Sequence, residues 1–311
     1  MRLVIALGGN ALLQRFECPE AGIQRHHVQV AAEQLAPVIA EHEVIISHGN
    51  GPQIGMLALE SEADVELNIP FPLDTLGAQT QGMIGYWLAQ ELANASVTRP
   101  IAVVLTQTVV DANDPAFDRP AKFIGRVYDE AEAHDLAHKR GWRVAADGTG
   151  WRRVVPSPEP VRLVELPTIR RLADAGTIVV CGGGGGAPVI AEGARLTGVE
   201  AVVDKDLTAA LLAVAVRADR LVLLTDVDSV RTGFGTPNEQ SLVEVHVDEL
   251  AEMSFPAGSM GSKIDACVRF ATATGRPAVI GALDHTAAVV AGNSGTTIKA
   301  DAMPALEPRP Q

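Results

Sequence analysis

The chain has 311 residues, and 47% of them are hydrophobic, enough to bury a sizeable core in one large α/β domain or two lobes. Its formal net charge of −13 gives no general attraction for nucleic acid or an anionic membrane, so we expect neither as a partner. The three scattered cysteines lack a CxxC spacing, which is typical of a cytoplasmic protein without a structural zinc site.

Apolar runs bounded by glycine alternate with segments of helical period, which is typical of βα units around a mainly parallel sheet. The expected strands are residues 3–7, 43–47, 101–106, 177–181, 220–225 and 277–283. Apolar residues at helical spacing predict helices within 28–39, 84–92, 207–218 and 264–273. Because Gly8 and Gly9 interrupt the first apolar run, we interpret it as a strand and not as a leader or a membrane span.

Residues 111–158 break this rhythm, because they are rich in charged and turn residues. EAEAHDLAHKRG (130–141) predicts a short helix, and WRVAADGTGWRRVV (142–155) predicts a hairpin that turns at Asp147-Gly148. Such an excursion is either a lid, a protruding subdomain or a solvated surface insertion, and the pattern alone does not separate these alternatives.

Five consecutive glycines at 182–186 follow the expected strand 177–181. No serine accompanies them, which disfavours a flexible linker. They fit the dinucleotide fingerprint G-x-G-x-x-A, with Asp204 about twenty residues further on, but Pro188 falls where the phosphate-binding helix should run. The remaining interpretation is a loop that approaches something small and charged.

Three further stretches place glycine, asparagine or serine at a strand end or a helix start: ALGGNAL (6–12), SHGNGPQIG (47–55) and SFPAGSMGSK (254–263). Backbone N–H groups at such places can point at an anion, and loops at the carboxyl ends of parallel strands converge on one crevice. None of the stretches has the Walker spacing, so the sequence predicts phosphate binding by a different arrangement.

Lysine is rare in the chain, which has 25 Lys and Arg residues in total but only the lysines Lys122, Lys139, Lys205, Lys263 and Lys299. Lys122, Lys205 and Lys263 lie in glycine-rich or acidic contexts. A lysine ammonium is a compact charge on a flexible stem, and phosphoryl transfer depends on positioning and charge neutralisation. We therefore expect these three lysines to act on phosphate and the other two to lie on the surface.

Several side chains near these lysines have two interpretations. Asp206 accepts hydrogen bonds from two lysine ammoniums, caps the helix that follows, or does both. Asp226 and Asp228 end an expected strand, where nucleotide or metal contacts tend to lie. His48 is expected to be a structural hydrogen-bonding residue, because a carboxylate that attacks phosphorus has no proton to remove.

As an ordered set, these motifs resemble the amino acid kinase superfamily, and within it the carbamate kinases, over nearly the entire chain. The resemblance implies an α/β fold, a three-layer αβα sandwich with a mainly parallel open sheet. It implies an N-terminal lobe (1–198) for carbamate or carbamoyl phosphate, with a protruding subdomain at about 112–157, and a C-terminal nucleotide-binding lobe (199–311). It also implies a homodimer.

The resemblance further implies reversible phosphoryl transfer between ATP and carbamate, run physiologically from carbamoyl phosphate and ADP, with Mg²⁺ bound to the nucleotide and no metal site of the protein's own. Lys122, Lys205 and Lys263 would contact phosphate, and Asp206 would orient the lysines. The implied phosphate-binding residues are Gly8, Gly9, Asn10, Gly49, Asn50, Gly51, Gly183 and Gly184. The implied nucleotide-binding residues are Lys205, Asp226, Val227, Asp228, Gly258, Ser259, Met260 and Lys263.

Some residues depart from the family pattern. Related kinases have a phosphate-binding lysine where this chain has Ala6, and in carbamate kinases a subdomain lysine, here Lys122, is thought to replace it. Phe123, Arg126 and Ser262 stand where the family often has proline. A kinase for another small carboxylic acid, a non-catalytic nucleotide or carbamoyl-phosphate sensor, and a dehydrogenase remain as alternatives.

Overall fold

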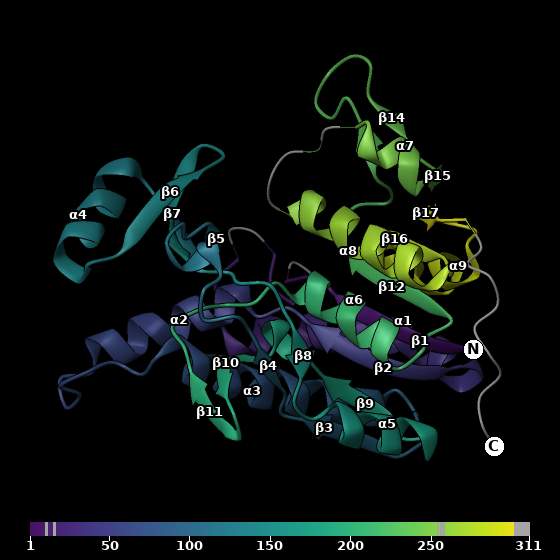
Figure 1. The fold of residues 1–311 in the computed structure, drawn as a ribbon, viewed down its shortest axis with the longest axis horizontal. Coiled ribbons are helices and arrows are strands. Elements are labelled where there is room, and N and C mark those ends of the chain that lie inside the picture. Colours follow the sequence, from purple (N-terminus) through teal and green to yellow (C-terminus); the bar gives the residue numbers. More distant parts are fainter. Residues whose placement is uncertain (10–11, 15–16, 254, 256–258, 302–311) are drawn as a thin grey trace.

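The computed structural model describes residues 1–9, 12–14, 17–253, 255 and 259–301 (Figure 1). Within this part of the chain the main sheet has eight strands. Their order is β15 (Glu244–His246), β17 (Thr296–Lys299), β16 (Ala278–Ala282), β12 (Arg220–Thr225), β1 (Arg2–Leu7), β2 (Glu43–His48), β9 (Ile178–Cys181) and β3 (Ile101–Val104). Neighbouring strands are parallel, except that β16 and β17 are antiparallel.

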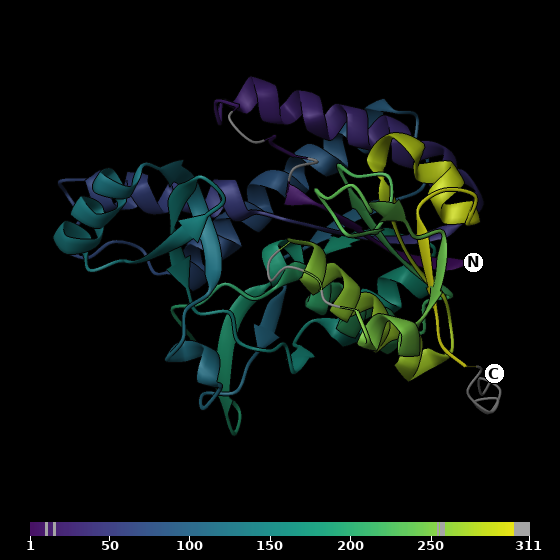
Figure 2. The same cartoon turned by 90° about the horizontal axis from the view of Figure 1, so that it is seen from above.

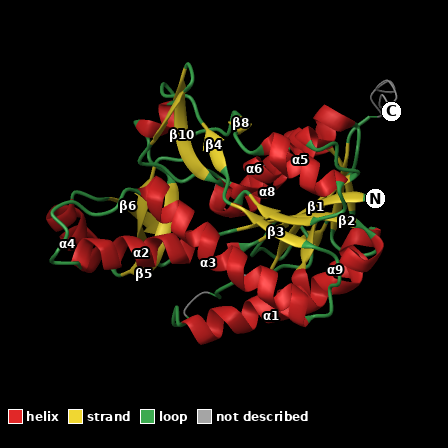
Figure 3. Cartoon of the chain, turned by 90° about the horizontal axis from the view of Figure 1, so that it is seen from below, coloured by secondary structure: helices red, strands yellow, loops and turns green. Residues whose placement is uncertain are grey.

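Helices cover both faces of this sheet (Figure 3). One face carries α1 (Ala21–Glu41), the carboxyl-terminal half of α3 (Leu73–Asn94) and α9 (Thr286–Ala291), and the other carries α5 (Leu166–Asp174), α6 (Lys205–Ala215) and α8 (Ser259–Thr274). Strand side chains alternate between the two cores: in β1, Leu3, Ile5 and Leu7 face α1, whereas Val4 and Ala6 face α6. The expected three-layer α/β sandwich with a mainly parallel sheet is therefore confirmed.

A second sheet lies beside the amino-terminal half of α3, with the order β11 (Arg195–Gly198), β10 (Ala187–Glu192), β4 (Gln107–Val109) and β8 (Arg162–Leu163). Two short elements, β13 (Arg231–Thr232) and β14 (Gln240–Ser241), pair after β12, and α7 (Val247–Ala251) follows β15. In the described residues no helix combines the length and the apolar character that a membrane span requires.

Residues 122–155 form a unit that stands away from the main sheet (Figures 1 and 2). It consists of β5 (Lys122–Tyr128), α4 (Glu130–Arg140), β6 (Arg143–Asp147) and β7 (Gly150–Val155), and the short turn η2 (Pro115–Phe117) precedes it. Asp129 caps α4, and β6 and β7 pair across the turn 147–150, so the expected helix and hairpin are confirmed. We call this unit the protruding unit.

The protruding unit rests on α2 (Gly51–Ala63). The two backbones meet at a pair of glycines, where a Cβ atom on Gly55 would lie 2.0 Å from Cα of Gly125. One carboxylate, that of Glu62 on α2, accepts hydrogen bonds from Arg140, Trp142 and Arg153. Close backbone packing at β5 and this shared carboxylate therefore fix the protruding unit against α2.

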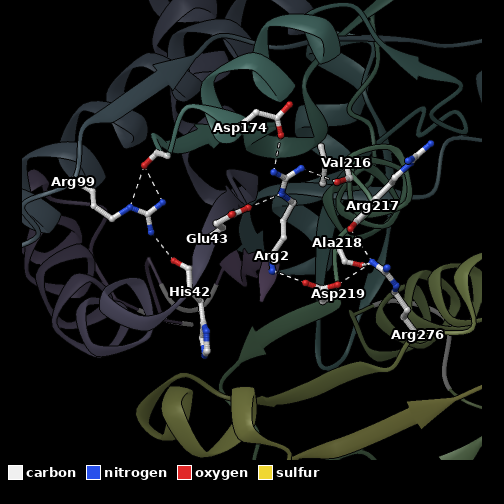
Figure 4. A network of polar contacts seen from close by, with 11 residues as sticks. Arg2, His42, Glu43, Arg99, Asp174, Val216, Arg217, Ala218, Asp219 and Arg276 are labelled. Atoms are coloured by element: carbon white, nitrogen blue, oxygen red, sulfur yellow. Dashed lines mark hydrogen bonds and ion pairs between the residues drawn. The ribbon is translucent and has the colours of Figure 1, made fainter. Parts of the chain in front are cut away.

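Arginines tie together the amino-terminal edge of the main sheet (Figure 4). Arg2 pairs with Glu43 at 2.9 Å and with Asp174 at 2.7 Å, and it donates to the carbonyl of Val216. Arg99 donates to the carbonyls of Gly176 and His42, where α5 and α1 have ended. A cation stabilises such helix carboxyl ends. The amino-terminal edge of the sheet, where the strands begin, is thus covered by these side-chain contacts. The opposite, carboxyl-terminal edge carries the glycine-rich loops.

We predict that Gly55→Ala loosens the protruding unit. The added Cβ would meet a backbone atom that cannot swing aside, so β5 must move off α2, at a cost of about 1–3 kcal/mol. Hydrogen exchange measured by mass spectrometry should become faster in residues 122–155 and stay unchanged in β1 and β2. Gly82→Ala on α3 is the matched control, because nothing lies within 4 Å of its added Cβ. Equal exchange in the two variants would contradict the prediction.

Candidate active site

Two glycine loops and a lysine meet at the carboxyl-terminal edge of the main sheet. The amide of Gly49, directly after β2, donates to the carbonyl of Leu7 in β1 at 3.0 Å. A Cβ on Gly49 would lie 3.0 Å from the amide nitrogen of Gly9 and 3.2 Å from Cε of Lys205. The expected convergence of these loops is therefore present, and Lys205 lies directly against it.

The loop after β2 leads straight into α2, which begins at Gly51. Asn50 takes the N-cap position, but its side chain makes no capping bond and instead donates from Nδ2 to Oγ1 of Thr80 on α3 at 2.9 Å. The first amides of a helix lack intrahelical partners and favour anions. The start of α2 thus adds donors beside Gly9 and Gly49.

The five glycines at 182–186 form a tight, buried turn that side chains from other elements approach closely. A Cβ would lie 2.3 Å from Nε2 of His48 if it stood on Gly183, and 2.1 Å from Nδ2 of Asn50 if it stood on Gly184. Four of the five glycines also have a positive φ. The space that a side chain on Gly183 or Gly184 would need is therefore occupied by His48 and Asn50.

The strand β10, and not a helix, follows this glycine turn. A dinucleotide fingerprint requires a helix whose amino terminus faces the pyrophosphate. The structure therefore removes the basis of the dehydrogenase alternative. Asp204, the acidic residue about twenty positions further on, lies at the start of α6.

Asp206 holds two of the three expected lysines. Its Oδ1 atom accepts a hydrogen bond from Nζ of Lys205 at 2.5 Å, and its Oδ2 atom accepts one from Nζ of Lys263 at 3.2 Å. Burial raises the pKa of Asp206, but the two ammoniums outweigh it and the pKa is lowered. Burial and the Lys263 ammonium lower the pKa of Lys205, against the opposing effect of Asp206. With all three groups ionised, Asp206 and its two lysines together carry one net positive charge.

The third lysine has a different partner. Nζ of Lys122, on β5, donates to Oδ2 of Asp204 at 2.5 Å. The Oδ1 atom of Asp204 accepts from the amides of Asp206 and Leu207, so Asp204 is the N-cap of α6. The alternative that Asp206 caps this helix is therefore wrong, because Asp206 lies in the first turn and its carboxylate is held by lysines.

His48 is buried at the end of β2, where its Nδ1–H donates to the carbonyl of Gly49 at 2.9 Å. Burial lowers the pKa of His48 to about 4, and the Lys205 ammonium acts in the same direction. The ring is therefore neutral at pH 7. It packs on Gly183, which fits the structural role expected for it.

The residues expected to bind nucleotide lie around β12 and α8. Asp226 and Asp228 are exposed after β12, Val227 between them is half-buried, and Met260, in the first turn of α8, packs on the core. The helix α8 begins at Ser259, five residues before the helix expected from periodicity, so Lys263 lies on the helix itself. Asn10 and Gly258 lie outside the described residues.

Two of the three departures from the family pattern have partners inside the protruding unit. Arg126 pairs with Glu132 and lies 4.6 Å from the centre of the Tyr128 ring. The guanidinium of Arg152 lies 5.7 Å from the centre of the Phe123 ring. Ser262 is half-buried in the first turns of α8.

Sequence reasoning missed the cap and the ion pair of Asp204. The signal for the cap was present, since an aspartate directly before an apolar helical run is a typical helix start.

Across the described residues, no group of three or more His, Cys, Asp or Glu side chains could hold a metal ion.

Comparison with known proteins agrees with this geometry. The sequence profile of the amino acid kinase family matches residues 1–282. The carbamate kinase of Rhizobium meliloti (strain 1021) is 51% identical over 302 residues, which cover 96% of this chain and 93% of that protein. A solved structure of carbamate kinase from Giardia lamblia bound to citric acid has a TM-score of 0.91 at 38% identity, covering 96% of this chain and 98% of that chain. The Giardia lamblia carbamate kinase bound to AMP-PNP has a TM-score of 0.86 at 39% identity, with the same coverage. The chain therefore belongs to the amino acid kinase family and, within it, to the carbamate kinases.

Proposed function

We propose that this chain transfers a phosphoryl group reversibly between ATP and carbamate, and that it runs from carbamoyl phosphate and ADP towards ATP and carbamate. One observation carries the proposal: two buried lysines share the carboxylate of Asp206, and one of them lies against two glycine loops. Relatives named carbamate kinase, one of them solved with the ATP analogue AMP-PNP, support the same substrates.

In the proposed reaction, a β-phosphate oxygen of ADP attacks the phosphorus of carbamoyl phosphate. A new P–O bond forms, and the bond between phosphorus and the carbamate oxygen breaks, leaving carbamate as an anion. Neither oxygen carries a proton at neutral pH, so the step needs positive charge and alignment but no proton acceptor. The neutral, buried His48 is consistent with this requirement.

The described residues divide this work by their places in the fold. Lys205 lies between the glycine loops and Asp206, and we assign it to the phosphoryl group in transfer. Lys122 approaches from the protruding unit with the same task, and Lys263 on α8 binds the nucleotide phosphates. The amides of Gly8 and Gly49 already donate to the carbonyls of Leu224 and Leu7, so we assign carbamoyl phosphate to the amides of Gly9, Asn50 and Gly51 and to those at Gly183 and Gly184. The shared carboxylate of Asp206 keeps Lys205 and Lys263 at a fixed spacing.

A magnesium ion would enter with the nucleotide, whose phosphate charge it neutralises. Both carboxylate oxygens of Asp206 are engaged by ammoniums, which leaves them unsuited to a cation. Asp226 and Asp228 are exposed carboxylates near the expected nucleotide site, and they suit an ion held mainly by phosphate oxygens and water.

The proposed assembly is a homodimer in the cytoplasm. The strand β3 ends the main sheet, and an unpaired sheet edge can pair with a second chain. Val103 and Leu105 on this edge and Tyr86 on the neighbouring α3 are exposed by 40%, 49% and 54%. Exposed apolar side chains gathered at a sheet edge suit an interface between two copies.

The proposed reaction predicts rapid ATP formation from carbamoyl phosphate, ADP and Mg²⁺. Acetyl phosphate and N-acetylglutamyl phosphate, offered as parallel donors, should give at most slow turnover. A coupled assay for ATP measures all three. A donor preference other than carbamoyl phosphate would assign the site to another small acid, and ADP binding without turnover would favour a sensor.

Removing single lysines should separate their roles. We expect Lys205→Ala to lower kcat by about 10²–10³-fold, because a charge preorganised for the transition state is lost. Lys122→Ala should lower turnover of carbamoyl phosphate about 100-fold and leave the dissociation constant of ADP unchanged by calorimetry. Lys139→Ala is the control, since this lysine pairs with Asp135 on the exposed face of α4. Loss of ADP binding in Lys122→Ala would argue against its assignment.

The buried His48 should make stability depend on pH. Since the pKa of His48 is about 4 in the folded protein and about 6.5 in the unfolded chain, only the unfolded chain binds the proton between these values. The free energy of unfolding therefore falls as the pH drops below 6.5. In His48→Asn this loss is absent. The free energy of unfolding of the native chain minus that of the variant should therefore be about 2 kcal/mol smaller at pH 5 than at pH 7.5. Urea unfolding at both pH values measures it, and an advantage independent of pH would contradict the prediction.

A further inference from the structure

The carboxylate of Asp204 has two different tasks, one for each oxygen. Oδ1 accepts from the amide of Asp206 at 2.9 Å and from that of Leu207 at 3.4 Å, which caps α6. Oδ2 accepts from Nζ of Lys122 at 2.5 Å. The side chain of Asp204 is 11% exposed and that of Lys122 is 30% exposed, so the pair is partly shielded from water.

This ion pair joins two parts of the molecule that carry different phosphate-binding lysines. Lys122 belongs to β5, which packs on α2 at Gly55, and Glu62 of α2 binds Arg153 on the paired strand β7. Asp204 belongs to the start of α6, in the same turn as Lys205 and Asp206. The Lys122 ammonium is therefore held beside the Lys205–Asp206 pair although the two lysines are 83 residues apart in the sequence.

We propose that Asp204 is the positioning residue for Lys122, an inference that rests on the function proposed above. A lysine ammonium has three N–H donors. Asp204 takes one of them, and the other two are directed to oxygens of the phosphoryl group. A lysine stem is flexible and loses rotamer freedom when its end is fixed. Asp204 imposes this order before the substrate arrives, so Lys122 is aligned when the phosphoryl group moves.

Asp204→Asn separates the two tasks. An asparagine keeps an oxygen for the helix cap, while its NH₂ group replaces the oxygen that accepts from Lys122 and presents a donor to a donor. We expect kcat with carbamoyl phosphate to fall about 10–100-fold, with the dissociation constant of ADP and the midpoint of thermal unfolding close to those of the native chain. Asp204→Ser, which also retains a capping oxygen, should behave alike.

A double-mutant cycle tests whether the loss acts through Lys122. In the Lys122→Ala background, Asp204→Asn should cause no further loss, because the group that it positions is already gone. An equal loss in both backgrounds would show that Asp204 acts through the helix cap or Lys205, and it would overturn the proposal, as would unchanged turnover in Asp204→Asn. Asp129→Asn is the matched control, since Asp129 caps α4 in the same way through the amide of Glu132 at 2.8 Å.

A second measurement does not depend on turnover. The chain has only five lysines, so ¹⁵N-labelled lysine should give a small set of side-chain ammonium signals. We expect a slowly exchanging signal, absent from Lys122→Ala, in the ligand-free native chain and its loss in Asp204→Asn. If the native chain fails to use carbamoyl phosphate, the proposed function is wrong, and persistence of this signal in Asp204→Asn would separately overturn the positioning of Lys122.

Discussion

The interaction on which the site depends is the sharing of one carboxylate, that of Asp206, by two buried ammoniums. Lys205 and Lys263 are 11% and 6% exposed, so without a counter-charge their mutual repulsion and their burial would favour loss of a proton. Asp206 is this counter-charge. It lies on α6 with Lys205, and the packing of α6 against α8 brings Lys263 to it. Small side chains, Ala209 and Ala213 on α6 and Ala266 on α8, are fully buried in this core and let the two helices approach closely.

The central strands were predictable from the sequence because they are buried on both faces and therefore read as continuous apolar runs. The second sheet was not, because its strands are short or partly exposed, as in β8 (Arg162–Leu163) and β11 (Arg195–Gly198). The helix α2 was also missed, since its first turn contains Gly51 and Pro52 and resembles a loop in one dimension. A helix of this kind is stabilised by tertiary contacts, here by α3 and β5.

The candidate site, like the fold, was predictable from the sequence only in part. Lysines in unusual contexts and glycines at strand ends could be recognised in one dimension, and the structure brings Gly9, Gly49 and Lys205 together. The pairing of Lys122 with Asp204 joins residues 82 positions apart and leaves no local pattern. The glycine run was understood only in part, because the contacts of Gly183 with His48 and of Gly184 with Asn50 depend on which loops the topology places side by side.

The separate uses of arginine and lysine explain how a strongly acidic chain can hold anionic substrates. Arginine has a planar group with several donors. At the amino-terminal edge of the sheet, Arg2, Arg99 and Arg276 use it to bind carbonyls and carboxylates (Figure 4). The lysines at the opposite edge are point charges, partly shielded from water, whose attraction is strong at contact distance and screened beyond about 10 Å. The net charge of −13 therefore weakens non-specific attraction of anions, while in the proposed reaction the ammoniums beside Asp206 would attract the phosphoryl group at short range.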